Sequence, residues 1–359
     1  MKAYKIGIIG LGAIGASIGM ALRHRSDHIQ ILGRDLMEQT GIQACEVGVI
    51  DQILRDDDIT ECDLIIIATP LRTIPAVIDQ IKHQLKPGAL VTDVGSVKAW
   101  VMECFAQALP PDVYYIGGHP LAGSEKSGLT AADKFLFENA AYVLTPDTST
   151  PADKLDEISD LIRSIGARVV IMQAEEHDRT IAGVSHVPHL FAASLMNNLH
   201  ENQDALELAG GGLRDMTRIA ASNADLWVDI LSLNTSAVTS ELRQASNHIN
   251  AYLKALESHD NEALRILLDQ ASILRKNAPV QRRCLQDAIE VIAIIPDTIG
   301  IIGEIGTILG DQGVHIQDIN ILGIRDEDEG TLRLKINQTQ AIQACNLLNA
   351  AGFKAWIRD

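Results

Sequence analysis

The fold of the N-terminal part of the chain is decided by the stretch YKIGIIGLGAIGASIGMALRHR, residues Tyr4–Arg25. Its apolar run Tyr4–Ile9 predicts a strand, and the apolar spacing of Ile14–Arg25 predicts a helix. Between them lies the pattern GxGxxG, formed by Gly10, Leu11, Gly12, Ala13, Ile14 and Gly15. A strand, a glycine-rich turn and a helix in this order are typical of a dinucleotide-binding βαβ unit.

The residues around this pattern predict how a dinucleotide would be held. The first glycine makes the turn, the second lets the pyrophosphate approach the backbone, and the third lets the helix pack on the strand. Asp35 stands 20 positions after Gly15, at the end of the expected second strand, where a carboxylate accepts hydrogen bonds from ribose hydroxyls. This favours NAD as the cofactor. Arg34 keeps NADP open as an alternative, because an arginine there can accommodate a 2′-phosphate.

Residues 1–172 alternate short β-rich runs with helical patterns, which predicts a doubly wound α/β domain of the Rossmann type. The expected strands are Tyr4–Ile9, Ile29–Leu32, Leu64–Ala68, Leu90–Val94, Val113–Ile116, Ala141–Leu144 and Val169–Ile171. Several of these runs are continuously apolar, as in strands covered on both faces. Thr69 and Pro70 follow the third strand, at the sheet edge where a dinucleotide lies, and are candidate cofactor contacts.

Composition excludes several classes of protein. The 359 residues are 47 % hydrophobic, which is enough for packed cores, and the net charge of −17 opposes binding to nucleic acids and anionic membranes. The run Ile6–Leu22 imitates a signal peptide, but its glycines and the lack of a cleavage pattern favour strand, turn and helix. No apolar run is long enough to span a membrane. Five scattered cysteines without a CxxC pair suggest a reduced, cytoplasmic protein.

The rest of the chain has two further kinds of sequence pattern, each of which predicts a separate domain. Residues 173–284 contain few glycines and a single proline before residue 279, and their apolar spacing predicts an all-helical domain that we expect to serve in dimerisation. Residues 285–359 have the order βαββαβ, which predicts a ferredoxin-like domain. The sequence therefore predicts a Rossmann-type domain, a helical domain and a small C-terminal domain.

Two segments at expected strand ends carry candidate chemistry. The first is Asp93–Lys98, DVGSVK, and the second is Gly117–Gly128, GGHPLAGSEKSG. In the second, His119 stands between paired glycines and a proline at the ligand-binding edge. A histidine there is placed to exchange a proton with a substrate hydroxyl near neutral pH, although a capping histidine in a loop would look the same.

Together these segments resemble the prephenate/arogenate dehydrogenase family. The helical part adds EHDR (176–179), SHVPH (185–189) and GGLRDMTRIA (211–220), and the segments PDTIG (296–300) and GVHI (313–316) resemble an ACT domain, a module that often binds amino acids. The resemblance covers essentially the whole chain. It implies an enzyme that oxidises prephenate with NAD⁺, releasing CO₂ and forming 4-hydroxyphenylpyruvate in tyrosine biosynthesis.

The resemblance also implies roles for particular residues. His119 would take the proton of the substrate hydroxyl, assisted by Ser96, and the guanidinium of Arg218 would hold a substrate carboxylate. Arg214, four residues earlier, is an alternative to Arg218. Further substrate contacts are expected from His189, Glu125 and Ser124. His186 and His189 stand three apart, but no third ligand accompanies them, so no metal is expected.

The ACT-like segment suggests feedback by an amino acid, with tyrosine as the expected effector and Gly300 and Asn320 as expected contacts. It departs from its family at Ile299, where a proline is usual, which leaves effector binding in question. With the helical domain, this module suggests a homodimer.

Three alternatives stay open. A β-hydroxyacid or 6-phosphogluconate-type dehydrogenase shares the architecture, but its catalytic lysine has no convincing counterpart here. Arogenate in place of prephenate would keep the mechanism and change the substrate. A catalytically silent sensor of NAD(H) and an amino acid is the alternative outside enzymes.

Overall fold

The structure is a computed structural model that describes residues 4–25, 28–123, 127–200, 204–278, 288–324 and 329–358. The chain divides into two compact units, Met1–Lys254 and Ala255–Asp359. We call them the N-terminal and C-terminal units. The domain boundary expected at residue 172 lies inside the N-terminal unit, and the one expected at residue 284 lies outside the described residues.

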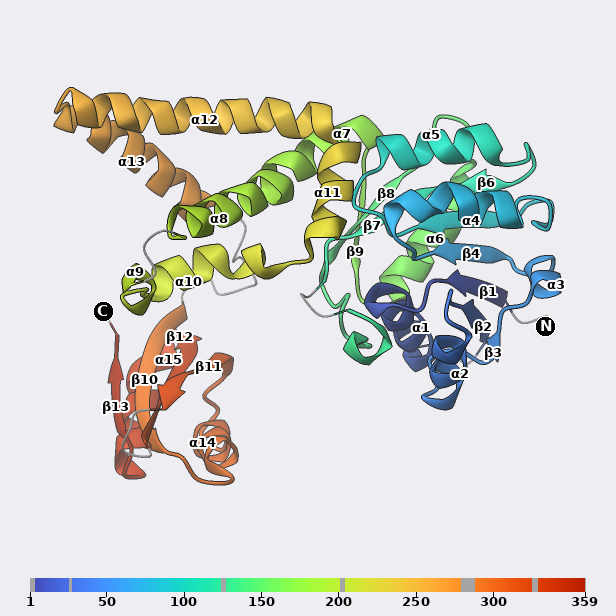
Figure 1. The fold of residues 1–359 in the computed structure, drawn as a ribbon. Helices are drawn as coiled ribbons and strands as arrows, with labels where there is room; N and C mark the ends of the chain where they lie inside the picture. The colour runs from blue at the N-terminus through green and yellow to red at the C-terminus, as the bar shows by residue number, and fades with distance from the viewer. Residues whose placement is uncertain are drawn as a thin grey trace. The chain divides into compact units, whose positions relative to one another are not determined.

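A six-stranded parallel sheet forms the centre of the N-terminal unit (Figure 1). Its order is β3-β2-β1-β4-β5-β6, which confirms the doubly wound Rossmann-type fold. The strands are β1 Tyr4–Ile9, β2 Ile29–Arg34, β3 Gln52–Ile53, β4 Leu64–Ile67, β5 Leu90–Asp93 and β6 Tyr114–Tyr115. The two-residue strand β3 was not expected from the sequence, because it offers too short an apolar run to stand out.

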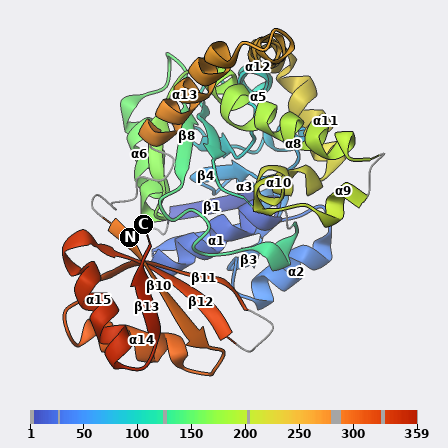
Figure 2. The ribbon, with the colours of Figure 1, turned by 90° about the vertical axis from the view of Figure 1, so that its left-hand side faces the viewer.

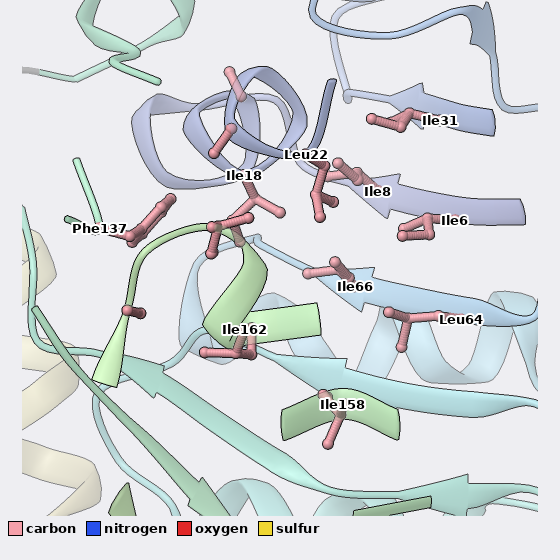
Figure 3. Packing of buried hydrophobic residues seen from close by; sticks show 14 of the residues in the cluster. Ile6, Ile8, Ile18, Leu22, Ile31, Leu64, Ile66, Phe137, Ile158 and Ile162 are labelled. Carbon is pink, nitrogen blue, oxygen red and sulfur yellow. The ribbon is translucent and has the colours of Figure 1, made fainter. Parts of the chain in front are cut away.

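Helices cover both faces of this sheet because its strands are apolar on both faces. Ile6, Ile8, Leu64 and Ile66 pack with Ile18 and Leu22 of α1 and with Ile158 and Ile162 of α6 (Figure 3). The alternate residues of β4, Ile65 and Ile67, pack on the other face with residues of α4 and α5. The helices are α1 Ala13–Arg25, α2 Glu38–Glu46, α3 Asp56–Ile59, α4 Ile74–Ile81, α5 Ala99–Ala108 and α6 Ala152–Ser164.

A second, three-stranded sheet completes the Rossmann-type part. Its order is β7-β8-β9, from β7 Gly117–Pro120, β8 Ala141–Thr145 and β9 Arg168–Ile171. β7 runs antiparallel to β8, with His119 opposite Val143. The sequence placed GGHP in a loop after a strand; the structure makes it a buried strand of its own. Two adjacent glycines and a proline weaken any strand signal, so only pairing with β8 reveals it.

The remaining described helices of the N-terminal unit are α7 Ala174–Ile181, α8 Val187–Asn198, α9 Asp204–Glu207, α10 Gly211–Thr217, α11 Ala224–Leu233 and α12 Thr235–Glu257, whose last residues enter the C-terminal unit. Helix α11 is fixed to the Rossmann-type part: its Ile230 is buried in the core on the α4–α5 face, and Arg72 pairs with Asp229 and donates to Ser232 Oγ at 2.6 Å. In the part of the chain that the structure describes, no helix combines the length and apolarity needed to cross a membrane.

The C-terminal unit begins in α12 and continues with α13 Asn261–Asn277. It then forms β10 Ala288–Pro296, α14 Ile301–Gly310, β11 Ile316–Ile324, β12 Glu329–Asn337, α15 Gln338–Ala350 and β13 Lys354–Ile357. The antiparallel sheet has the order β11-β12-β10-β13, and α14 and α15 pack on one of its faces (Figure 2). This confirms the βαββαβ fold.

Candidate active site

The glycine-rich turn joins β1 to α1 and is tight at both ends but open in the middle. Gly10 has φ of +98°, and a Cβ there would lie 2.4 Å from the carbonyl oxygen of Ala68. A Cβ on Gly15 would lie 2.0 Å from the carbonyl oxygen of Gly10. At Gly12, by contrast, no described atom lies within 4 Å of where a Cβ would be. The turn therefore leaves the backbone accessible where a pyrophosphate would approach it.

Asp35 lies beside this turn, at the end of β2. Its Oδ2 accepts a hydrogen bond from the Leu11 N–H at 2.8 Å, and its Oδ1 accepts one from Met37 N–H at 3.2 Å. Arg34 forms an ion pair with Asp56, with 2.7 Å between Nη1 and Oδ1. Its guanidinium is therefore already neutralised by a carboxylate, which disfavours a 2′-phosphate as its partner.

Thr69 and Pro70 follow β4, across from the glycine-rich turn. The Cγ2 of Thr69 lies 3.1 Å from where a Cβ of Gly10 would be. The buried Oγ1 of Thr69 has no hydrogen-bond partner among the residues that the structure describes. A buried hydroxyl without a partner is costly, so this one is suited to a ligand that supplies the missing bond.

A buried ion pair at the end of β5 anchors the strand that carries His119. Asp93 and Lys98 are fully buried and paired. The Asp93 carboxylate also accepts hydrogen bonds from Tyr115 Oη at 2.7 Å, Gly95 N at 2.7 Å and Gly118 N at 3.1 Å. Lys98 Nζ donates to the Gly118 carbonyl at 2.6 Å. The pair therefore holds both backbone groups of the residue directly before His119.

His119 is 9 % exposed, and its Nδ1 lies 2.8 Å from His177 Nε2. Burial lowers the pKa of His119 well below 6.5, and the nearby His177, Lys98 and His186 act in the same direction. The imidazole is therefore neutral near pH 7, as a group that accepts a proton must be.

A cavity of about 620 Å³ opens in front of His119 within the N-terminal unit. Its wall includes His119, Ser96, Ser185, His186, Arg218 and Trp227. His186 reaches it from a π-helical turn, Ala182–His186, in which the Val187 N–H bonds to the Ala182 carbonyl five residues back. Such turns often occur at functional sites. The structure thus brings together His119, Ser96 and Arg218, which are far apart in the sequence.

The other residues expected at the site have different positions. His189 does not line this cavity; it is buried, and its ring stacks on that of Trp227, with 3.5 Å between ring centroids. Arg214 and Arg218 do not share one regular helix, because α10 ends at Thr217 and Arg218 begins a 3₁₀ turn. Arg218 lines the cavity and Arg214 does not. Ser124 and Glu125 lie outside the described residues.

Sequence reasoning assigned no role to three residues at this site. Trp227 covers His189 and lines the cavity, and His177 and Asp178 lie behind His119. The segment EHDR, which resembles the family, contains His177 and Asp178, but the sequence does not indicate that they lie behind His119. Within the described ranges, no group of three or more metal-ligating side chains is placed to hold a metal ion.

The fold and this site define a class: an oxidoreductase with a Rossmann-type nucleotide domain whose substrate cavity is completed by a helical region. The chain is 34 % identical over 337 residues to "Prephenate dehydrogenase" of Bacillus subtilis. The matched region spans 91 % of this chain and 90 % of that protein. The chain belongs to the prephenate dehydrogenase family.

Further comparisons agree. The family's nucleotide-binding domain matches residues 18–171 and its dimerization domain matches residues 173–270. The "Prephenate dehydrogenase" of Lactococcus lactis is 32 % identical and covers 94 % of this chain and 95 % of its own length. A crystal structure of prephenate dehydrogenase from A. aeolicus in complex with hydroxyphenyl propionate and NAD⁺ is 28 % identical, with a TM-score of 0.71 over 77 % of this chain and 98 % of that one.

Proposed function

We propose that this protein catalyses the NAD-dependent oxidative decarboxylation of prephenate to 4-hydroxyphenylpyruvate and CO₂, a step of tyrosine biosynthesis in the cytoplasm. The observation that carries the proposal is one cavity lined by a neutral histidine, a serine and an arginine, at the end of a Rossmann-type sheet. The family to which the chain belongs supports it. The four described cysteines, Cys45, Cys62, Cys104 and Cys345, are free thiols, as suits a reducing compartment.

The chemistry follows from the substrate. Prephenate carries two carboxylates and a 4-hydroxyl on a cyclohexadiene ring, so its oxidation at C4 allows the ring carboxylate to leave as CO₂ and the ring to become aromatic. NAD⁺, when bound, accepts the hydride from C4. His119 accepts the proton of the hydroxyl group at Nε2, since its Nδ1 is bonded to His177. Ser96 lies in the same wall and assists in holding the hydroxyl.

Arg218 is the residue we assign to a substrate carboxylate, and its replacement tests this. In Arg218→Ala, kcat/KM for the substrate is expected to fall about 10- to 150-fold, as for loss of a hydrogen bond to a charged group. Arg214→Ala is the matched control, because Arg214 lies four residues earlier, is exposed and does not line the cavity. Steady-state kinetics of both variants give kcat/KM for the substrate. A larger fall in Arg214→Ala than in Arg218→Ala would assign the substrate carboxylate to Arg214 instead.

The cofactor preference rests on the pair formed by Arg34 and Asp56. Because Asp56 neutralises Arg34 while Asp35 remains beside the ribose position, we expect NAD to be preferred over NADP. Asp56→Ala would release the guanidinium and raise kcat/KM for NADP relative to NAD several-fold. The ratio of the two kcat/KM values, measured for both proteins, tests this. An unchanged ratio would show that Arg34 does not govern the preference.

The experiment that tests the proposed function follows absorbance at 340 nm. NADH formed from NAD⁺ with prephenate would support it. Turnover of arogenate alone would keep the mechanism and change the substrate. Silence with both, despite NAD⁺ binding, would favour the sensor alternative.

We also propose that the C-terminal unit binds an amino acid, with tyrosine as effector. A cavity of about 260 Å³ in this unit is lined by Gly300, Asp297, Thr298 and Ile321. Gly300 has φ of +92° and precedes α14, while Asn320 is exposed and does not line the cavity. An inhibition curve that stays flat up to millimolar tyrosine would exclude this regulation.

The assembly we propose is a homodimer. The match to the family's dimerization domain supports it, and α12 exposes four large apolar side chains, Leu242, Ile249, Leu253 and Leu256. Light scattering of the protein as it elutes from a size-exclusion column would give the mass of the assembly. That mass distinguishes a dimer from a monomer.

A further inference from the structure

Behind His119, a continuous series of hydrogen bonds leads away from the cavity into α7. His119 Nδ1 lies 2.8 Å from His177 Nε2, and His177 Nδ1 lies 2.8 Å from Asp178 Oδ1. His177 is fully buried and Asp178 is 5 % exposed. In the proposed reaction His177 has served only as the hydrogen-bond partner of His119 Nδ1, and Asp178 has had no part.

Asp178 is itself held from several sides. Its Oδ1 accepts the Lys98 N–H at 2.7 Å, and its Oδ2 accepts the Ala99 N–H at 3.0 Å. Its carbonyl oxygen accepts from Asn234 Nδ2 at 2.8 Å. Both oxygens of this buried carboxylate therefore act as acceptors toward backbone N–H groups. An ionised carboxylate only accepts hydrogen bonds, so the proton between His177 and Asp178 belongs to His177 Nδ1.

The proton on His177 Nδ1 determines which ring nitrogen of His119 is protonated. A neutral imidazole with its proton on Nδ1 has a lone pair on Nε2, so His177 Nε2 must accept a hydrogen bond from His119. His119 then carries its proton on Nδ1 and keeps its lone pair on Nε2. A doubly protonated His177 would reverse this order, but it would place a charged imidazolium at a fully buried position, which is costly.

We propose that His177 and Asp178 are positioning residues that hold His119 in the tautomer with a free Nε2, and that the Asp178 carboxylate compensates the charge His119 gains on accepting the substrate proton. This rests on the proposed function. In the reaction, the hydroxyl O–H bond breaks, its proton bonds to His119 Nε2, and Nδ1–H remains bonded to His177. Asp178 stays ionised throughout.

The tautomer can be observed without any substrate. In the full-length protein with ¹⁵N-labelled histidine, the imidazole ¹⁵N shifts distinguish a protonated from an unprotonated ring nitrogen. The signals of His119 are identified by their absence in His119→Asn. We expect His119 to be protonated at Nδ1 and unprotonated at Nε2. The opposite pattern in the wild-type protein would overturn the proposal.

Two variants of His177 separate positioning from packing. His177→Gln places a carbonyl oxygen near the former Nε2 and keeps an acceptor for His119, whereas His177→Phe keeps the ring and removes the acceptor. We expect kcat to fall about 10- to 100-fold in the Phe variant and to be largely restored in the Gln variant, with NAD⁺ affinity and melting temperature compared in both. Equal turnover in the two variants would contradict the assigned role.

Asp178→Asn tests whether the negative charge of Asp178 supports His119 as a proton acceptor. Because the amide carries no charge, His119 should become a weaker proton acceptor, so kcat falls about 10- to 100-fold and the acid limb of its pH profile moves to lower pH. A pH profile that does not move would overturn this part. If the wild-type protein oxidises neither prephenate nor arogenate, the proposed function fails, while the ¹⁵N shifts still decide the tautomer.

Discussion

In His119→Asn, kcat with prephenate is expected to fall about 10²- to 10⁴-fold, the range that loss of a general base produces. An asparagine amide takes roughly the place of Nδ1, so the bond to His177 and the cavity wall are kept. What is lost is Nε2, the atom that we propose accepts the substrate proton. NAD⁺ binding should be unchanged, because the glycine-rich turn does not contain this residue.

The pH dependence of the wild-type enzyme belongs to the same prediction. In the mechanism that we propose, neutral His119 is the active form and its protonated form is inactive. Since burial lowers the pKa of His119 below 6.5, kcat/KM should be lost only as the pH falls below 6.5, and not at the pH where an exposed histidine titrates.

The matched control is His83→Asn, in which an exposed histidine just after α4 receives the same change. Its kcat should equal that of the wild type. Stopped-flow absorbance at 340 nm measures the chemical step in all three proteins. Full turnover by His119→Asn would move the proton acceptor elsewhere in the cavity.

In Asp93→Asn, the free energy of unfolding is expected to fall by about 3–5 kcal/mol, as when one partner of a buried ion pair is removed. The Lys98 ammonium would keep the Gly118 carbonyl but lose the charge that stabilises it. Burial already lowers the pKa of Lys98, and Asp93 opposes that shift. Without Asp93 the ammonium is therefore no longer compensated.

Lys98→Met is the companion variant, and we expect it to be the less destabilising of the two. The Asp93 carboxylate would still accept from Tyr115 Oη, Gly95 N and Gly118 N, so most of its hydrogen bonds survive. Urea unfolding compares the variants in a Trp356→Phe background, where the fluorescence comes from Trp100 and Trp227, both in the N-terminal unit. A more stable Asp93→Asn would contradict the assigned role of the pair.

Sequence patterns predicted the regular elements well where local physics decides them. The apolar run of β1, the glycine-rich turn and the helix α1 follow from hydrophobic periodicity and from the φ values that only glycine adopts readily. The βαββαβ order of the C-terminal unit could be read in the same way. Local patterns failed at β7, where Gly117–Pro120 becomes a strand only because β8 is present to pair with it.

The same distinction between local sequence patterns and tertiary contacts applies to the candidate site. The sequence by itself indicated the glycine-rich turn and His119, and its resemblance to the family pointed to Ser96 and Arg218. It could not determine that Lys98 and Asp93 clamp Gly118, that His189 turns toward Trp227, or that His177 lies against His119. These contacts join residues distant in the chain, and their strength depends on burial, which only the packed tertiary structure creates.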